Sequence, residues 1–154
     1  MRSADVVVVG TGAAGLFHAL FLPRDYKVIM ITKKEVEESD SFLAQGGISA
    51  LKNEDDFDSY FEDTMKAGHY ENDKGAVEKM IRESPQIIKD LREFGVRFDE
   101  KDGQVQFTRE GGHSTFRILH HEDLTGKEIT SHLYEEAKKR ENIEIMTHCT
   151  MLDI

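Results

Sequence analysis

The first 32 residues carry a hydrophobic pattern that is typical of a parallel βαβ unit. Residues 5–9 form a mostly β-branched run closed by a glycine, which predicts a strand buried on both faces. Residues 16–22 predict a helix that Pro23 ends, and residues 27–32 predict a second strand. A right-handed crossover between two parallel neighbouring strands is the expected geometry.

Apolar residues at helical spacing predict three helices in the middle of the chain. The first spans residues 56–67 and carries its large apolar side chains on one side, and the second spans residues 73–82. Ser84 is a suitable N-cap and Pro85 suits a first helical position. We therefore expect a third helix to begin there and to end before Gly95.

The last third of the chain predicts a hairpin, a helix and a strand. Residues 96–98 and 105–108 flank an Asp-Gly pair at 102–103, which favours a β-hairpin. Residues 126–140 predict a helix, and residues 143–154 predict a closing strand or hairpin. The parallel sheet would then have few strands against a typical five or six. We therefore expect an incomplete domain.

Gly10, Gly12 and Gly15 match the G-x-G-x-x-G pattern directly after the first predicted strand. Gly10 permits a tight turn, Gly12 leaves room for a pyrophosphate, and Gly15 allows close packing of helix and strand. The free N–H groups at a helix start favour an anion. This turn predicts dinucleotide binding by Gly10, Thr11, Gly12, Ala13, Ala14 and Gly15.

The residues after the second strand leave the choice of dinucleotide open. An acid about 20 residues after the glycines usually binds the ribose, and Glu35 falls slightly late. The hydroxyl of Thr32 is an alternative ribose ligand, whereas Lys33 and Lys34 would suit a phosphate. The turn alone therefore does not separate FAD from NAD or NADP.

Residues 33–53 show no clear period, yet they are too apolar for disorder, which favours a functional loop. Residues 41–48, Ser-Phe-Leu-Ala-Gln-Gly-Gly-Ile, resemble the flavin-contacting segment of the succinate dehydrogenase and fumarate reductase flavoprotein family. The resemblance implies FAD as the cofactor. It places Asp40, Ser41, Phe42, Leu43, Ala44, Gln45, Gly46 and Gly47 beside the flavin, where the two glycines would let the backbone approach a flat ring.

A second segment is similar to the L-aspartate oxidase branch of this family. It comprises residues 108–114 (Thr-Arg-Glu-Gly-Gly-His-Ser), 117–120 (Arg-Ile-Leu-His) and 123–126 (Asp-Leu-Thr-Gly). The resemblance implies oxidation of L-aspartate to iminoaspartate, the first step of quinolinate and NAD biosynthesis. Oxygen or fumarate would accept the electrons, and quinolinate synthase would act downstream. The alternatives are a fumarate reductase or succinate dehydrogenase flavoprotein, and a dinucleotide-binding fragment without activity of its own.

Two positions gain a role from this resemblance. Glu110 matches the residue that orients the substrate amino group, where a carboxylate can bind an ammonium by a charge-assisted hydrogen bond. Asp40 stands where a histidine of the dehydrogenase branch carries the flavin covalently, so the FAD should be bound non-covalently. The acid/base residue and the other substrate ligands lie later in the family's chain. We therefore expect this chain to be an N-terminal part and inactive alone.

Composition narrows the functional classes. The net charge of −10 argues against nucleic-acid and anionic-membrane binding. No apolar run is long enough for a membrane helix, and the first residues do not resemble a signal peptide. Cys149 is the only cysteine, which suits a reducing cytoplasm, and it is expected to be a buried small apolar side chain.

Neither group of potential metal ligands predicts a metal site. The acidic stretch at 54–63 is interpreted as a solvated loop and helix face. His113, His120 and His121 lack a cysteine partner, so polar loop or supporting roles are expected for them.

The sequence thus predicts an α/β fold, the N-terminal part of an FAD-binding domain. A Rossmann-type βαβ unit (1–32) with a parallel sheet is followed by a flavin loop (33–53). A helical and loop insertion (54–142) and a returning strand (143–154) complete it.

Overall fold

The computed structural model describes residues 2–153, which separate into two compact units. As far as they are described, the first unit comprises Met1–Gln45, Phe94–Val96 and Gly126–Ile154, and the second comprises Gly46–Glu93 and Arg97–Thr125.

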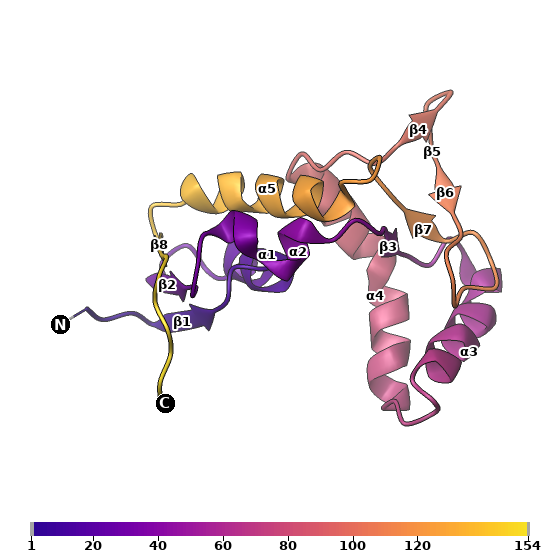
Figure 1. Ribbon diagram of the computed structural model, residues 1–154, viewed down its shortest axis with the longest axis horizontal. Coiled ribbons are helices and arrows are strands. Elements are labelled where there is room, and N and C mark those ends of the chain that lie inside the picture. Colours follow the sequence, from indigo (N-terminus) through magenta and orange to yellow (C-terminus); the bar gives the residue numbers. More distant parts are fainter. Residues whose placement is uncertain (1, 154) are drawn as a thin grey trace. The chain divides into compact units, whose positions relative to one another are not determined.

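The first unit is built on a parallel sheet of three strands, β1 (Val6–Val9), β2 (Val28–Ile31) and β8 (Ile143–Met146) (Figure 1). β2 lies in the centre, so the order is β1-β2-β8. This confirms the parallel βαβ unit. Burial of β1 on both faces was a wrong expectation, because Val8 is 9% exposed whereas Val7 is 57% exposed. Alternate side chains point to opposite faces, and only the face of Val8 is covered within the described residues.

Two long helices complete the first unit, α1 (Ala13–Phe21) and α5 (Thr125–Lys138). α1 begins three residues before the predicted helix, because the extended Gly12 is its N-cap and the next residues are already helical. The helix predicted over residues 126–140 is confirmed as α5, and its side chains Ile129, Leu133 and Ala137 are buried. The closing strand is shorter than predicted, as β8 ends at Met146 and the described residues after it form no strand.

The loop at 33–53 contains regular structure that its sequence did not indicate. A 3-10 turn (Val36–Glu38) is followed by the short helix α2 (Asp40–Leu43). Ser39 caps α2 by accepting a hydrogen bond from the backbone N–H of Phe42. Capping hydrogen bonds of this kind order a segment that has no hydrophobic period.

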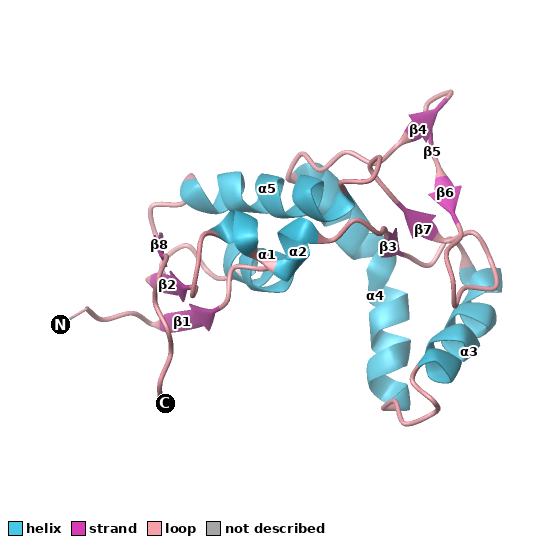
Figure 2. Cartoon of the chain, viewed as in Figure 1, coloured by secondary structure: helices cyan, strands magenta, loops and turns pink. Residues whose placement is uncertain are grey.

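The second unit contains two packed helices, α3 (Phe57–Ala67) and α4 (Lys74–Glu93), drawn in cyan in Figure 2. A buried hydrophobic cluster joins the two helices to Leu51, in the segment before α3. Phe57 and Phe61 pack against this cluster, in agreement with the predicted apolar side of α3. The cluster consists of Leu51, Tyr60, Met65, Val77 and Ile81.

α4 replaces two predicted helices, because Pro85 lies inside it instead of opening a new one. Proline has no N–H to donate to the carbonyl four residues earlier. The hydroxyl of Ser84 donates to that carbonyl, Ile81 O, at 2.6 Å. It also accepts a hydrogen bond from Leu51 N–H at 2.9 Å. This side chain compensates for the missing backbone bond, which lets the helix continue.

The remaining strands of the second unit are short. β3 (Ile48–Ser49), β7 (Ile118–Leu119) and β6 (Phe107–Thr108) form an antiparallel sheet in that order. β4 (Glu100–Lys101) and β5 (Gln104–Val105) form the hairpin.

The predicted hairpin turn is confirmed, because Asp102 and Gly103 have φ values of +54° and +75°. The predicted first strand at 96–98 was misplaced. A two-residue turn pairs the residues directly beside it, so the strand begins at Glu100.

Candidate functional site

The glycine turn joins β1 to α1. Gly10 has a φ of +106°, and its N–H donates to Ile31 O at 2.8 Å. A Cβ on Gly15 would lie 2.3 Å from Gly10 O, so helix and turn approach too closely for any side chain. A Cβ on Gly12 would lie 2.8 Å from Ser41 Oγ. The turn therefore needs glycine for its own packing, and it brings Ser41 of α2 to the start of α1.

A cavity of about 560 Å³ opens at this turn. It brings together many of the residues predicted from sequence, namely Gly10, Thr11, Gly12, Thr32, Lys33, Asp40 and Ser41. Phe42 to Gln45 and the helical residues Ala13 to Gly15 are not among its lining residues. Thr11 is only 1% exposed, and its hydroxyl has no hydrogen-bond partner within the described residues.

The far side of the cavity is formed by residues after β8, which sequence reasoning missed. Cys149 N–H donates to Thr32 O at 2.9 Å, and Cys149 and Met151 line the cavity. Cys149 is half-buried, so its expected place in a buried strand was wrong. Only the parallel pairing of β8 with β2 brings these distant residues to the glycine turn.

Glu35, one of the possible ribose ligands, is already bonded within the protein. His148 Nε2 lies 2.7 Å from Glu35 Oε1, and Glu35 also forms a capping box with Glu38. Thr32 and Lys33 line the same cavity, and within the described part of this unit their side chains form no such bond. The geometry therefore favours Thr32 and Lys33 over Glu35 as cofactor ligands.

The first half of the predicted flavin-contacting segment, residues 41–48, is held against α5. Gly126 N–H donates to Ala44 O at 3.0 Å, and a Cβ on Gly126 would lie 2.2 Å from Ser41 O. Gly126 therefore has a structural explanation, because only glycine allows this close approach.

The second unit brings Gly46 and Glu110 together, although they are far apart in sequence. A Cβ on Gly46 would lie 3.5 Å from Glu110 Oε2. Gly47 has a different explanation, since its Cβ would lie 2.2 Å from Ile118 Cγ2 and would disrupt the packing against β7. The carboxylate of Glu110, an exposed residue, thus borders Gly46 in the predicted flavin-contacting segment.

Beside this pair lies a buried cluster of charges around Arg117, which is 0% exposed. Arg117 Nε and Nη2 donate to the two carboxylate oxygens of Asp56 at 3.1 and 2.9 Å. Arg117 Nη1 donates to Asp63 Oδ2 at 2.6 Å. The guanidinium also lies 4.8 Å from the ring centroid of Tyr60. We call these four residues, with Ser59, His113, Ser114 and Thr115 that bond to them, the Arg117 cluster.

A family model described as "FAD binding domain" matches residues 5–154. The chain belongs to this family. Curated relatives agree. The L-aspartate oxidase of Clostridium perfringens is 44% identical over 99% of this chain, and that of Clostridium acetobutylicum is 46% identical over 97%. The chain spans 35% of the length of each of these two relatives.

Solved structures show the same relationship. The Sdh1 complex of Mycobacterium smegmatis contains a chain with 31% identity and a TM-score of 0.83, covering 96% of this chain and 28% of that one. The FrdA subunit of E. coli quinol fumarate reductase has 26% identity and a TM-score of 0.87, covering 94% and 26%. The predicted membership of the succinate dehydrogenase and fumarate reductase flavoprotein family is confirmed.

The cofactor of an FAD-binding domain fits the cavity at the glycine turn. Thr11 presents a buried hydroxyl that needs a polar partner, and a pyrophosphate supplies acceptor oxygens. Gly12 stands at the N-terminus of α1, where backbone N–H groups favour an anion. These observations agree with FAD, the cofactor that this family binds.

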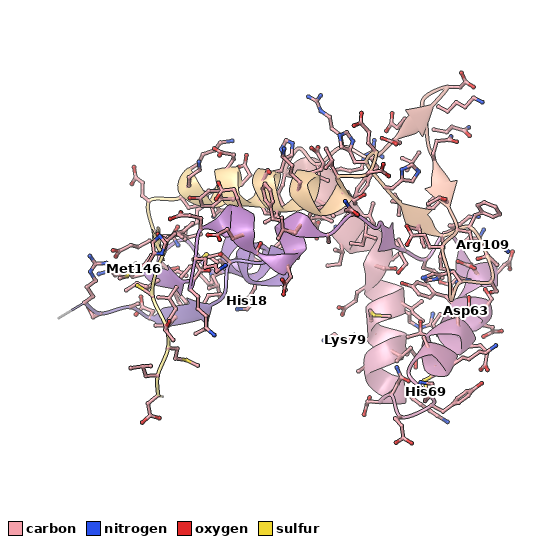
Figure 3. The ribbon with its side chains drawn as sticks, viewed as in Figure 1. His18, Asp63, His69, Lys79, Arg109 and Met146 are labelled. Carbon is pink, nitrogen blue, oxygen red and sulfur yellow. The ribbon has the colours of Figure 1, made fainter. Side chains whose placement is uncertain are left out.

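The acidic stretch at 54–63 was expected to be a solvated face, and for two of its residues this was wrong. Asp56 is 9% exposed, and both Asp56 and Asp63 bind Arg117. Figure 3 labels Asp63 on α3 and Arg109 at the start of the loop that carries Glu110. The signal in the sequence was the spacing of seven residues, which places both carboxylates on one helical face.

Ionisation follows from these contacts. Burial raises the pKa of Asp56, but hydrogen bonds from Arg117, Thr115 and Ser59 lower it more, to about 2. Burial also opposes the charge of Asp63, yet bonds from Ser114 and Arg117 lower its pKa. Burial lowers the pKa of Arg117, but the carboxylates of Asp56 and Asp63 raise this pKa more. All three groups are therefore charged at neutral pH.

The described residues contain no group of three or more histidine, cysteine, aspartate or glutamate side chains that could hold a metal ion. His113 Nδ1 lies 3.1 Å from Arg117 Nη1, and His120 and His121 lie beside Asp99. Among the described residues, no helix combines the length and apolarity needed to cross a membrane.

Proposed function

We propose that this chain provides the FAD-binding part and the amino-group recognition of a flavin-dependent L-aspartate oxidase. The observation that carries the proposal is the carboxylate of Glu110 beside Gly46, in a chain that is 44% identical to a relative named L-aspartate oxidase. A negative charge at the edge of the flavin loop suits a substrate that carries an ammonium group.

The proposed reaction converts L-aspartate to iminoaspartate, which removes a hydride from Cα and a proton from the amino group. The FAD that residues 10–15 and 32–33 would hold would supply the two-electron acceptor for this hydride, with oxygen or fumarate as the final oxidant. Glu110 would bind the substrate ammonium by a charge-assisted hydrogen bond and so orient Cα. It would also disfavour dicarboxylates without an amine, because these leave the glutamate charge without a partner.

We propose the following ligands for the cofactor. The pyrophosphate would lie at residues 10–15, and Thr32 and Lys33 would bind the ribose or a phosphate. Residues 40–47 would flank the flavin, and Asp40 offers no nucleophilic nitrogen for a covalent link. We therefore expect acid precipitation of the complete protein to release the FAD. Flavin that stays with the precipitate would contradict non-covalent binding.

The substitution Glu110→Gln in the complete FAD-loaded protein tests the proposal. The amide keeps the size of the side chain but removes the charge that faces the ammonium. Hydrogen bonds to charged groups contribute about 1.5–3 kcal/mol, so kcat/KM for L-aspartate should fall by roughly tenfold to a hundredfold. Fumarate reduction, measured on the same preparation, should change little.

Glu71→Gln is a matched control, because Glu71 is an exposed glutamate of the same unit. It should leave both reactions unchanged. Equal losses of the two reactions in Glu110→Gln would make Glu110 a structural residue and remove the support for L-aspartate.

A second candidate is succinate oxidation or fumarate reduction, favoured by the 31% identity to a chain of the Sdh1 complex. In that case Glu110→Gln would not discriminate between substrates, and the protein would turn over dicarboxylates faster than L-aspartate. For the first candidate, quinolinate synthase in the cytoplasm is the proposed consumer of iminoaspartate.

A further inference from the structure

We propose that Arg117 is a positioning residue that holds the Glu110 loop in the form that recognises the amino group of the substrate. The inference rests on the proposed function, since it assigns to Arg117 a role that is exerted through Glu110. It concerns the segment from Glu110 to Thr115, which we call the Glu110 loop.

Within the described residues, the side-chain hydrogen bonds that attach the Glu110 loop to α3, and to Asp56 directly before it, come from its second half. Asp63 Oδ2 accepts hydrogen bonds from the N–H of Ser114 at 2.7 Å and from its hydroxyl at 2.8 Å. Thr115 Oγ1 donates to Asp56 Oδ1 at 2.8 Å. Glu110, Gly111 and Gly112 are exposed, and Gly112 has a φ of +87°. The place of Glu110 is therefore set by the anchored residues that follow it.

Arg117 fixes the orientation of both anchoring carboxylates. Its guanidinium is a rigid, planar fork of donors, and it bonds to Asp56 and Asp63 at once. Asp63 Oδ2 accepts from Arg117 and Ser114 together, so the angle at which Arg117 holds this carboxylate determines where Ser114 lies.

A second contact leads from Arg117 towards Glu110 through His113. Arg117 Nη1 can only donate, so His113 Nδ1 accepts at 3.1 Å and the ring proton lies on Nε2. The N–H of His113 donates in turn to Glu110 O at 3.2 Å. His113 therefore links the guanidinium of Arg117 to the backbone of Glu110, through its ring on one side and its backbone N–H on the other.

The other side of Arg117 leads to the flavin loop. The N–H of Ala50 donates to Arg117 O at 3.0 Å, directly after β3. β3 pairs with β7 in the register Ile48 with Leu119, and it follows Gly46 and Gly47. Arg117 therefore ties the strand after Gly46 to the loop that carries Glu110, which are the two sides of the proposed site.

Stability alone does not explain this arrangement. Well-packed apolar side chains often stabilise a fold as well as a buried ion cluster does. They would lack the directional hydrogen bonds that set the angle of two carboxylates. The cluster is therefore better explained by the geometry that it imposes on the Glu110 loop.

The test uses Arg117→Lys in the complete FAD-loaded protein. Lysine keeps the charge but loses the fork, so the carboxylates remain paired while their angle is released. We expect kcat/KM for L-aspartate to fall about tenfold, with fumarate reduction changed less than about twofold and flavin content unchanged. Arg82→Lys is the control, because Arg82 pairs with Glu54 and Glu78 on the exposed side of α4.

A double-mutant cycle with Glu110→Gln shows whether Arg117 acts through Glu110. In the Glu110→Gln background, Arg117→Lys should cause little further loss with L-aspartate, because the two changes remove one interaction. Additive losses would overturn the positioning role while leaving the proposed function intact. If Glu110→Gln reduced L-aspartate oxidation and fumarate reduction equally, the proposed function would be overturned. The role of Arg117 in substrate recognition would then be overturned with it.

Hydrogen exchange gives a readout that needs no activity. The Ser114 amide should exchange faster in Arg117→Lys than in the parent, whereas amides of the α5 region should not change. Unchanged protection of Ser114 would mean that Asp63 holds the loop without Arg117, and the inference would be wrong.

Discussion

The glycine turn at residues 10–15 forms its site from backbone, whereas the Arg117 cluster holds its loop with charged side chains. In the turn, no side chain separates Gly15 from the carbonyl of Gly10, and Gly10, Thr11 and Gly12 line the cavity. In the cluster, the carboxylates of Asp56, directly before α3, and Asp63, on α3, bind Arg117, directly before β7. The sequence separation is up to 61 residues. One site depends on the absence of side chains and the other on their ionisation.

This difference predicts different sensitivities. The glycine turn should fail with the addition of a single carbon atom, yet it should be indifferent to pH, because it contains no titratable side chain. The Arg117 cluster should tolerate changes of volume better, but it should lose stability when a partner is removed or neutralised.

Gly15→Ala should have the largest effect. Its Cβ would lie 2.3 Å from Gly10 O, a backbone atom of the turn that cannot move aside. We expect a destabilisation of more than about 5 kcal/mol, which is comparable to the whole stability of a small domain. Loss of the cooperative transition in thermal unfolding would show it.

Gly111→Ala is the matched control, because a Cβ there meets nothing within 4 Å. It should shift the free energy of unfolding by less than about 0.5 kcal/mol. If both variants fold equally well, the close approach at Gly15 is not a constraint on the first unit.

The same contrast explains what the sequence could predict. The strand, turn and helix at the N-terminus are encoded by neighbouring residues, so the parallel pairing and the cofactor cavity followed from local pattern. Thr32 and Lys33, which the sequence proposes as cofactor ligands, line that cavity. Cys149 was not expected there, because only the tertiary pairing of β8 brings it to the cavity.

The pairing of Arg117 with Asp56 and Asp63 could not be predicted from local pattern, because the spacing of the two carboxylates indicates a shared face but no partner. Asp56 and Asp63 belong to an acidic run that is typical of a solvated face, and their partner lies far along the chain. Similarly, the pair Ser84-Pro85 predicts a helix start, because serine is a common N-cap and proline suits the first helical position. The side chain of Ser84, which satisfies the free carbonyl, is visible only in the structure.

Arg117→Ala should have the next largest effect. It leaves Asp56 and Asp63 as partly or fully buried charges without their main partner. Removing one partner of a buried ion pair costs about 3–5 kcal/mol, which urea unfolding of the second unit can measure. Arg117→Met should lower the free energy of unfolding less than Arg117→Ala does, because the methionine side chain refills part of the volume of the arginine. Equal losses of stability in the two variants would mean that the missing charge alone, and not the missing volume, destabilises the second unit.

Lowering the pH should have a smaller effect on stability, which we expect chiefly in the second unit. The pKa of Asp56 is about 2 in the folded protein against a usual 3.8. A lowered folded pKa contributes stability that is present above the unfolded value and is lost as pH falls through the folded one. Between pH 4 and pH 2, the gap from 3.8 to about 2 predicts a loss of about 2 kcal/mol.

The lowered pKa of Asp63 adds to this loss in the same direction. Hydrogen exchange at low pH can follow the two units separately. Ser114 should lose protection before the amides of β2 do. The opposite order would show that the glycine turn, and not the cluster, limits stability in acid.

Thr115→Val should have the smallest effect and shows whether the cluster acts as one unit. The hydroxyl of Thr115 donates to Asp56 at 2.8 Å, and valine keeps the shape without the donor. One hydrogen bond contributes about 1 kcal/mol, so the free energy of unfolding should fall by that amount at neutral pH. The loss in acid should also become shallower, because the pKa of Asp56 moves back towards 3.8. Thr108→Val, at a half-buried threonine of β6, is the control. If the two variants have the same stability and the same acid profile, then Arg117 and Ser59 alone hold Asp56, and the cluster is a set of independent pairs.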